Sequence, residues 1–308
     1  MSTIEKALAK QKQAAQDNRD NLEAQDISLK QAEDSTSGET KNQIKETQTS
    51  LESTTPTQKL KREKETLILN GEHLTERGFI FNANSAHHIQ EEFRHIKRKL
   101  INNAFGPTAK TLKHSNLIMV SSSNPNEGKT FISINLALSI ALEQDKTVLL
   151  VDADVLRPSI HRELEFESKQ GLLEYLLDEV SSLSDVIYNT SIPNLKLIPA
   201  GKPHHLTNEL LASEKMASLA EELAQRYPDR IVIFDCPPIL GVTETPVLSS
   251  LVGQAVVVVE ELKTKVADVK KAVSQLNEDI AVGFVMNKTI RSKKDEYGYY
   301  GYGYGKKH

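Results

Sequence analysis

The sequence lacks the features of several protein classes. It has no tryptophan, one cysteine and only 5% aromatic residues among 308 positions. A single cysteine, Cys236, excludes an internal disulfide framework and favours a reducing compartment. No run of 18 apolar residues occurs, and the first residues lack the apolar core of a secretory signal. We therefore expect a cytoplasmic protein that reaches the inner face of the cytoplasmic membrane only through a membrane-protein partner.

Aromatic residues are also absent from the first quarter of the chain, since none precedes Phe79. Residues 11–66 consist mainly of Gln, Lys, Glu, Asp, Ser and Thr, which bury too little apolar surface to offset their ordering entropy. We expect residues 1–78 to be a mostly disordered tether, with a solvated helix or coiled coil as the alternative. Ser2 and Glu5 have capping-box spacing, which indicates either a short docking helix or merely nascent helix.

The overall charge of the chain does not favour binding to nucleic acid. The formal net charge is −4, so we expect no nucleic-acid binding.

Order is expected to begin near Phe79, and an amphipathic helix follows from Ser85. Its charged residues Glu91, Arg94 and Lys97 lie beside an apolar stripe, so we expect them to face outward and contact another subunit. A solvated helix face is the alternative. The apolar stripe consists of Ile89, Phe93, Ile96 and Leu100.

Six apolar, β-rich runs alternate with helical patterns over the rest of the chain. They are nearly continuous rather than alternating in polarity, as strands covered on both faces are. The expected fold is therefore a doubly wound α/β domain with a mostly parallel sheet, spanning residues 79–290. The expected strands are residues 116–121, 147–152, 195–199, 230–235, 254–260 and 281–287.

The segment Ser123–Thr130 fits the phosphate-loop pattern G-x-x-x-x-G-K-[ST], with serine in place of the first glycine. An expected strand precedes it and a helical pattern follows. Loop amides and the helix N-terminus would hold the phosphates of ATP, with Lys129 beside them and the Thr130 hydroxyl reaching Mg²⁺. The predicted nucleotide contacts in and next to this loop are Ser123, Asn124, Pro125, Asn126, Glu127, Gly128, Lys129, Thr130 and Phe131.

Three carboxylates follow two other expected strands. Asp152 and Asp154 end one strand two residues apart, which points both side chains to the same side, and Asp235 ends another. Beside a phosphate loop, three such acids predict a Mg²⁺ site plus one candidate base. For Asp152 or Asp235 alone, the alternative is a loop-capping role. Cys236 is expected to be a small buried residue, not a nucleophile.

Together these motifs resemble those of the bacterial tyrosine kinases, P-loop enzymes associated with exopolysaccharide export. SSSNPNEGKT, VLLVDADVLRP and IVIFDCPP resemble the family's Walker A, Walker A′ and Walker B motifs. Further family segments are resembled by IPAGKPHHLTNELLAS, KTK around Thr264, GFVMN and EEFRHIK, so the likeness covers roughly residues 85–304. Through GFVMN the resemblance implies Asn287 as a further ATP contact. IEKAL and DADVLRP are most similar to the branch encoded with exosortase and PEP-CTERM loci. The departures are Leu156, Lys97 and Glu244.

The resemblance implies an ATP-dependent tyrosine autokinase that phosphorylates its own C-terminal segment, residues 291–308, in trans within a homo-oligomer. Asp152 would be the base, while Thr130, Asp154 and Asp235 would hold Mg²⁺ and Lys129 would stabilise the transferred phosphoryl group. It also implies a role in exopolysaccharide synthesis, polymerisation or export, and an inner-membrane chain-length or co-polymerase protein as activator. The implied acceptors are Tyr297, Tyr299, Tyr300, Tyr302 and Tyr304.

Three alternatives remain at this point. The terminal Tyr/Gly stretch could serve weak association instead of catalysis. The chain could be a positioning ATPase of the ParA/MinD group, although Asn124 stands where that group has lysine. It could also be a non-catalytic, nucleotide-gated scaffold for polysaccharide machinery. Phosphotyrosine formation with ATP and Mg²⁺ separates these alternatives.

Overall fold

The computed structural model describes residues 66–81 and 87–290. The chain divides into two units, Met1–Leu60 and Lys61–His308, and every described residue belongs to the second. Residues 1–65 of the expected tether, with the predicted N-terminal helix, and the tyrosine segment 291–308 lie outside the described residues.

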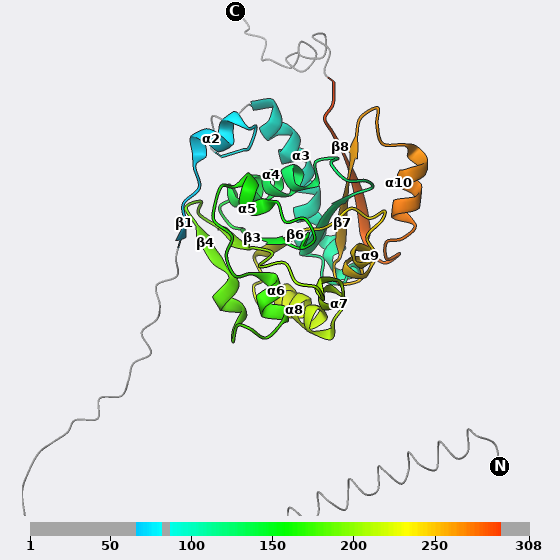
Figure 1. Cartoon of the computed structure of the whole chain (residues 1–308). Helices are drawn as coiled ribbons and strands as arrows, with labels where there is room; N and C mark the ends of the chain where they lie inside the picture. Colours follow the sequence, from blue (N-terminus) through cyan, green and yellow to red (C-terminus); the bar gives the residue numbers. More distant parts are fainter. Residues whose placement is uncertain (1–65, 82–86, 291–308) are drawn as a thin grey trace, which may run out of the picture. The chain divides into compact units, whose positions relative to one another are not determined.

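An eight-stranded sheet runs through the described domain in the order β1-β4-β5-β3-β6-β2-β7-β8 (Figure 1). Every neighbouring pair is parallel except β4 and β5, which are antiparallel. The prediction of a doubly wound, mostly parallel sheet is confirmed. The strands are β1 Thr66–Leu67, β2 Leu117–Ser122, β3 Thr147–Asp152, β4 Tyr188–Thr190, β5 Leu195–Ile198, β6 Arg230–Asp235, β7 Gln254–Glu260 and β8 Ala281–Asn287.

Helices cover both faces of this sheet (Figure 1). Helices α3 and α4 pack on one face and α6 and α8 on the other, because the central strands are apolar on both sides. The helices are α2 Gly71–Glu76, α3 His87–Phe105, η1 Pro107–Thr111, α4 Lys129–Ala141, α5 Ile160–Glu163, α6 Leu172–Leu176, η2 Leu183–Val186, α7 Thr207–Leu211, α8 Glu214–Gln225, α9 Glu244–Ser249 and α10 Val266–Val273.

The domain begins earlier than its sequence predicts. Residues before Phe79 already form β1 and α2, and Leu67, Leu69 and Leu74 are buried in the core. β1 pairs with β4, a partner more than 120 residues away that local composition does not reveal. The boundary expected at residue 79 is therefore too late by at least 13 positions, from Thr66 to Phe79.

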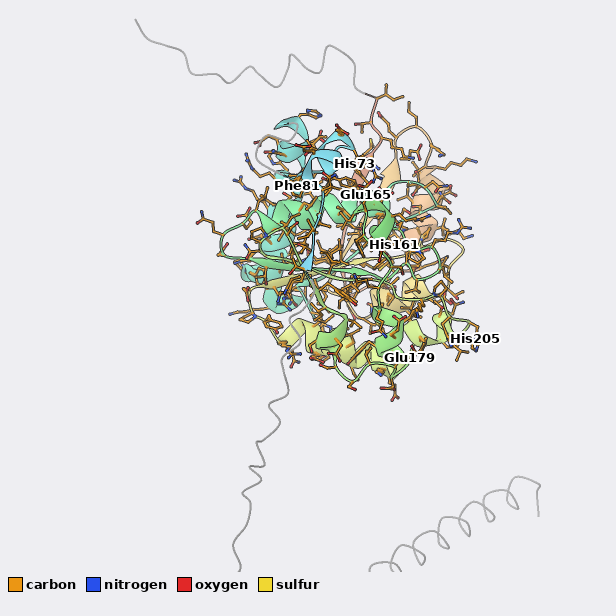
Figure 2. The ribbon with its side chains drawn as sticks, turned by 60° about the vertical axis from the view of Figure 1, so that its left-hand side comes forward. His73, Phe81, His161, Glu165, Glu179 and His205 are labelled. Atoms are coloured by element: carbon orange, nitrogen blue, oxygen red, sulfur yellow. The ribbon has the colours of Figure 1, made fainter. Side chains whose placement is uncertain are left out.

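Side chains also attach α2 to the domain. His73 of α2 and Glu165, which follows α5, approach one another, with Nδ1 and Oε2 2.7 Å apart (Figure 2). Just after α2, the backbone N–H of Ile80 donates to Oδ1 of the buried Asn135 at 2.8 Å. These contacts hold the segment 66–81 against α4 and α5.

Candidate functional site: the phosphate loop and its acids

The loop between β2 and α4 has the conformation that its sequence requires. Gly128 adopts a left-handed φ of 96° immediately before α4 begins at Lys129. A Cβ atom at this position would lie 2.0 Å from Nδ2 of Asn287. Both the backbone angle and the close approach therefore require glycine here.

The end of strand β8 is hydrogen-bonded to the phosphate loop. Asn287, its last residue, donates from Nδ2 to the carbonyl oxygen of Glu127 at 2.9 Å. The next residue, Lys288, donates from Nζ to the carbonyl oxygen of Asn126 at 2.7 Å. The predicted residue Asn287 thus belongs to the loop's surroundings, and Lys288 is an addition that its position next to Asn287 could have indicated.

Glu127 supports the loop from within. Its carboxylate is buried, 3% exposed, and accepts from the backbone N–H of Asn124 at 3.0 Å. It also accepts from the Thr264 hydroxyl at 2.6 Å. Thr264 lies between β7 and α10, so this carboxylate joins the phosphate loop to a segment 137 residues away.

Two predicted acids are direct neighbours in the sheet. Asp152 ends β3 and Asp235 ends β6, and the two are register partners. Both are almost fully buried. Burial, reinforced by the Asp235 charge, raises the pKa of Asp152 well above its usual range. Burial likewise raises the pKa of Asp235, against the opposing effect of Lys129 and two hydroxyl donors.

Lys129 balances these charges. Its Nζ lies 2.6 Å from Oδ2 of Asp154 and 3.8 Å from Oδ2 of Asp235. Burial alone would lower the pKa of Lys129, but the charges of Asp235, Asp154 and Asp152 outweigh burial and raise it. The lysine is therefore held in its charged form among the strand-end acids.

Hydroxyl groups surround Asp235. Thr130 donates to Oδ2 at 2.7 Å and Ser133, one turn further along α4, donates to Oδ1 at 3.0 Å. Ser159 lies 2.8 Å from the Thr130 hydroxyl. Ser133 and Ser159 are not among the residues predicted from the sequence. Helical spacing from Thr130 could have indicated Ser133, whereas Ser159 is brought in by the turn before α5.

The donor set beside the loop partly fits a hydrated Mg²⁺ ion. Thr130 Oγ1 and Asp235 Oδ2 already touch and could contact such an ion. Such hard oxygen donors suit Mg²⁺, which keeps several of its waters. Asp154 is engaged by Lys129 instead. Oδ1 of Asp152 is buried with no hydrogen-bond partner among the described residues, so it remains open to a donor other than the metal. Within residues 66–81 and 87–290, no group of three or more His, Cys, Asp or Glu side chains could hold a metal ion by itself.

The side chains of two other predicted nucleotide contacts, Phe131 and Ser123, have surroundings of their own. The Phe131 ring packs against Phe79, with centroids 5.2 Å apart. The hydroxyl oxygen of Ser123 is buried and has no partner among the described residues.

The charged side chains of α3 do not all face outward. Glu91 forms an ion pair with the exposed Arg94, as an outward helix face allows. Lys97, in contrast, is only 7% exposed: its Nζ donates to the carbonyl oxygen of Ser139 at 2.7 Å and lies 2.6 Å from Glu143. The expectation that Lys97 faces a neighbouring subunit is wrong, because its long apolar stem carries the ammonium group across the core edge to α4.

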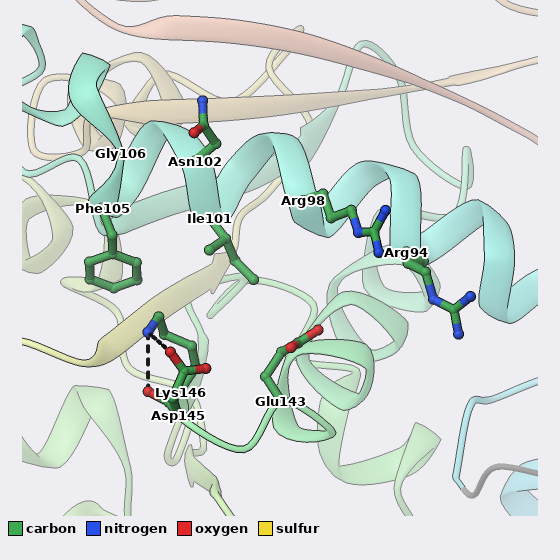
Figure 3. A pocket seen from close by; sticks show the side chains of 9 residues that line it. All are labelled: Arg94, Arg98, Ile101, Asn102, Phe105, Gly106, Glu143, Asp145 and Lys146. Carbon is green, nitrogen blue, oxygen red and sulfur yellow. Dashed lines mark hydrogen bonds and ion pairs between the residues drawn. The ribbon is translucent and has the colours of Figure 1, made fainter.

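Arg94 lines a surface pocket of about 450 Å³ together with Arg98 (Figure 3). Phe105 and Lys146 form part of its wall, with Lys146 Nζ 5.0 Å from the ring centroid. Lys146 is itself paired with Asp145 at 2.6 Å. The pocket therefore presents charges of both signs next to the predicted subunit contact.

Two departures from the family pattern, Leu156 and Glu244, differ in exposure. Leu156 is half exposed, whereas Glu244 is buried and accepts from the Thr243 hydroxyl at 2.7 Å.

Cys236 is fully buried, as expected, and burial raises the pKa of its thiol well above the usual range. The five predicted acceptor tyrosines lie outside the described residues.

Comparisons with known proteins show which family this chain resembles. A family model described as an AAA domain matches residues 115–290. Tyrosine-protein kinase YwqD of Bacillus subtilis is 35% identical over 187 residues, which cover 60% of this chain and 77% of that protein. Tyrosine-protein kinase ptk of Acinetobacter johnsonii is 36% identical over 180 residues, which cover 58% of this chain. The matched segment spans 24% of the length of ptk.

Solved structures show the same fold. The kinase domain of the Escherichia coli tyrosine kinase ETK has a TM-score of 0.59 at 26% identity, covering 80% of this chain and 89% of that one. The chimerical protein CapA2B2 has a TM-score of 0.61 at 27% identity, covering 74% and 96%. Among the described helices, none is both long and apolar enough to cross a bilayer.

Proposed function

The chain belongs to the bacterial tyrosine kinases, and on that premise we propose that it is an ATP-dependent protein-tyrosine autokinase. Its acceptors would be the tyrosines of its own C-terminal segment: Tyr297, Tyr299, Tyr300, Tyr302 and Tyr304. The observation that carries the proposal is the position of Lys129, which reaches from the phosphate loop to the acids at the ends of β3 and β6.

The residues around Lys129 would take the roles that phosphoryl transfer needs. Loop amides and Lys129 would hold the phosphates of ATP. Thr130 and Asp235, with Asp154, would hold Mg²⁺, which neutralises charge on the phosphate oxygens when bound. Asp154 would give up its ion pair with Lys129 when that lysine turns to the nucleotide, and would then be free to help hold Mg²⁺.

Asp152 is the proposed base. A phenol with a pKa near 10 is a weak nucleophile at neutral pH and needs a positioned proton acceptor. A tyrosine oxygen would attack the γ-phosphorus of ATP, the bond from that phosphorus to the bridging oxygen would break, and ADP would leave. The phenolic proton would pass to Asp152, whose raised pKa makes it a stronger base than an exposed carboxylate.

We further propose the organisation around this kinase domain. Residues before the domain would act as a tether, and residues 291–308 as the acceptor tail. Transfer would occur in trans between copies, with Glu91 and Arg94 at the subunit contact. The activity would regulate exopolysaccharide synthesis, polymerisation or export at the inner face of the cytoplasmic membrane, together with a membrane-protein activator. These proposals rest on the family resemblance.

Incubation of purified protein with ATP and Mg²⁺ tests the central proposal. We expect phosphotyrosine on the C-terminal peptide, detected by mass spectrometry, and ADP formed with it. ATP hydrolysis without phosphotyrosine would favour a positioning ATPase, and nucleotide binding without either product would favour a scaffold. The Lys129→Ala chain is the matched control for contaminating kinases.

A further inference from the structure

Exposed apolar side chains gather at one edge of the domain. Among the described residues, eleven large apolar side chains are exposed, and five of them lie between residues 262 and 290. Phe284 and Met286 on β8 are 55% and 60% exposed. We call this group the β8 patch; it consists of Leu262, Val266, Phe284, Met286 and Ile290.

Strand pairing brings the members of the patch near one another in the fold. Val282, Phe284 and Met286 alternate along β8 and share one face of the sheet. Val282 packs against the core cluster that contains Ala272 of α10, but α10 does not cover the two residues that follow. β7 and β8 are register partners up to Glu260 and Asn287, which brings the turn after β7 beside the end of β8. Figure 1 shows α10 and β8 together at this side of the domain.

β8 is also an edge strand without the usual protection. It is the last strand in the sheet order and pairs only with β7 among the described strands. Its sequence, AVGFVMN, contains no charged residue and no proline. Edge strands usually carry such residues to discourage association, so an uncharged apolar edge indicates a surface with an occupant.

We propose that the occupant is the unphosphorylated tyrosine segment of the same chain, residues 297–304. The tail begins directly at the patch, because Ile290 belongs to it and its N–H donates to Glu261 at 2.6 Å. Seven residues separate Ile290 from Tyr297, a reach of up to roughly 23 Å, and six separate it from Phe284, about 20 Å. The tail is therefore long enough to fold back over the strand that it leaves.

Chemistry favours this occupant. Tyrosine presents an apolar ring with a polar tip, and aromatic and methionine side chains attract such rings. In an extended segment, Tyr300, Tyr302 and Tyr304 fall on one side with glycines on the other. The short connection also gives the tail a high effective concentration at the patch, which a separate molecule would lack.

Phosphorylation should release the docked tail. Each phosphate adds roughly −1.5 to −2 charges, which an apolar surface cannot solvate. Two of the nearby cations, Lys263 and Lys288, are already paired with Glu260. That this release happens during autophosphorylation rests on the proposed function; the docking itself does not.

Hydroxyl-radical footprinting without ATP tests the docking directly. It would compare the full chain with a chain ending at Glu296. We expect oxidation of Phe284 and Met286 to be several-fold slower in the full chain, with Leu142, exposed elsewhere, oxidised equally in both. Equal oxidation of Phe284 and Met286 in the two chains would overturn the proposal. The double variant Phe284→Ser/Met286→Ser should increase oxidation of the tail tyrosines, whereas Leu142→Ser should not.

Two further comparisons identify the occupant and the release. Protection should not change with protein concentration; protection that appears only at high concentration would assign the patch to a second copy's tail. Replacing the five tail tyrosines by Phe should keep the protection, and replacing them by Glu should remove it. A Glu tail that still protects would refute release by charge. Since none of these measurements uses ATP, an inactive kinase would leave their outcome unaffected.

Discussion

The ammonium group of Lys129 lies 2.6 Å from Oδ2 of Asp154, and this ion pair joins the phosphate loop to the end of β3. Both side chains are largely enclosed, 12% and 5% exposed. A phosphate that approaches Lys129 must therefore compete with a carboxylate already in place. Charge at position 154 and nucleotide affinity should be coupled through the same lysine.

Lys129→Ala should abolish ATP-dependent tyrosine phosphorylation, a loss of about a hundredfold or more, because the developing phosphoryl charge loses its cation. It should also lower the free energy of unfolding by about 3 kcal/mol, since Asp154 and Asp235 would remain buried without their partner. Phosphotyrosine formation and urea unfolding measure the two effects. Lys215→Ala, which removes a surface pair with Asp178, should change neither. Full activity in Lys129→Ala would remove the lysine from catalysis.

Asp152→Asn should separate stability from catalysis. Because burial raises the pKa of Asp152 in the folded state, its contribution to stability is complete below the ordinary value of 3.8 and is lost as pH rises through the raised pKa. The charged form of Asp152 therefore opposes folding. The isosteric amide should stabilise the protein by about 1 kcal/mol, or roughly 2–4 °C in Tm, while turnover falls about a hundredfold.

Thermal unfolding without ATP and Mg²⁺, followed as a function of pH, checks the sign. The advantage of Asp152→Asn should shrink as pH falls toward 3.8, because the wild-type carboxyl then becomes protonated as well. Ser182→Ala, at an exposed cap on the surface, gives a control without a buried acid. Wild-type turnover in Asp152→Asn would assign the base role to another group.

Thr264→Val should weaken ATP binding although Thr264 is outside the phosphate-loop motif. It removes the hydroxyl that donates to the buried Glu127 carboxylate and leaves that charge less well satisfied. We expect the KM for ATP to rise about tenfold, corresponding to a charge-assisted hydrogen bond of about 1.5 kcal/mol, with a smaller change in kcat. Lys263→Ala, at the neighbouring exposed position, should leave KM unchanged. An equal KM in the two variants would show that the loop keeps its shape without this bond.

Most of the sheet could be predicted from the sequence because its main strands are long and apolar and are followed by polar residues. β3, β6, β7 and β8 have the predicted bounds, and the phosphate loop lies between a strand and a helix as its motif requires. Strands β1 and β4 were missed because they are only two and three residues long and take their stability from pairing. Such non-local pairing leaves no periodic pattern in the sequence.

Side-chain direction was harder to predict than element position. The α3 stripe correctly placed Phe93 and Leu100 in the core, yet Lys97 lies beside them and points inward to Ser139. Helical spacing gives the face of a residue, but a long flexible stem can carry its charge past that face. The link between Glu127 and Thr264 was equally hidden, because it depends on how the turn after β7 meets the loop.

Glu91→Ala combined with Arg94→Ala should weaken assembly of the unphosphorylated protein. These residues form the exposed ion pair on α3 and are the part of the predicted subunit contact that faces outward. We expect slower sedimentation without a change in Tm beyond about 2 °C, since surface pairs contribute little to stability. Lys97→Ala is the informative contrast: it should lower Tm because it breaks buried contacts with Ser139 and Glu143. An unchanged sedimentation profile for the double variant would mean that α3 is only a solvated surface.

Transfer between copies is the expected route for phosphorylation of the tail. From Asn287, the last strand residue, to Tyr300 there are 13 residues, which span at most roughly 43 Å. That length suffices to reach a neighbouring active site. Because Lys288 contacts the loop at Asn126, the tail also starts beside its own chain's site, so the test must separate the two routes. The test mixes a Lys129→Ala chain, inactive but with its tail intact, with an active chain whose five tail tyrosines are replaced by Phe. Phosphate should appear on the inactive chain, faster at higher total concentration if assembly is weak. If the inactive chain stays unlabelled while wild-type protein labels itself at a concentration-independent rate, transfer occurs within one chain.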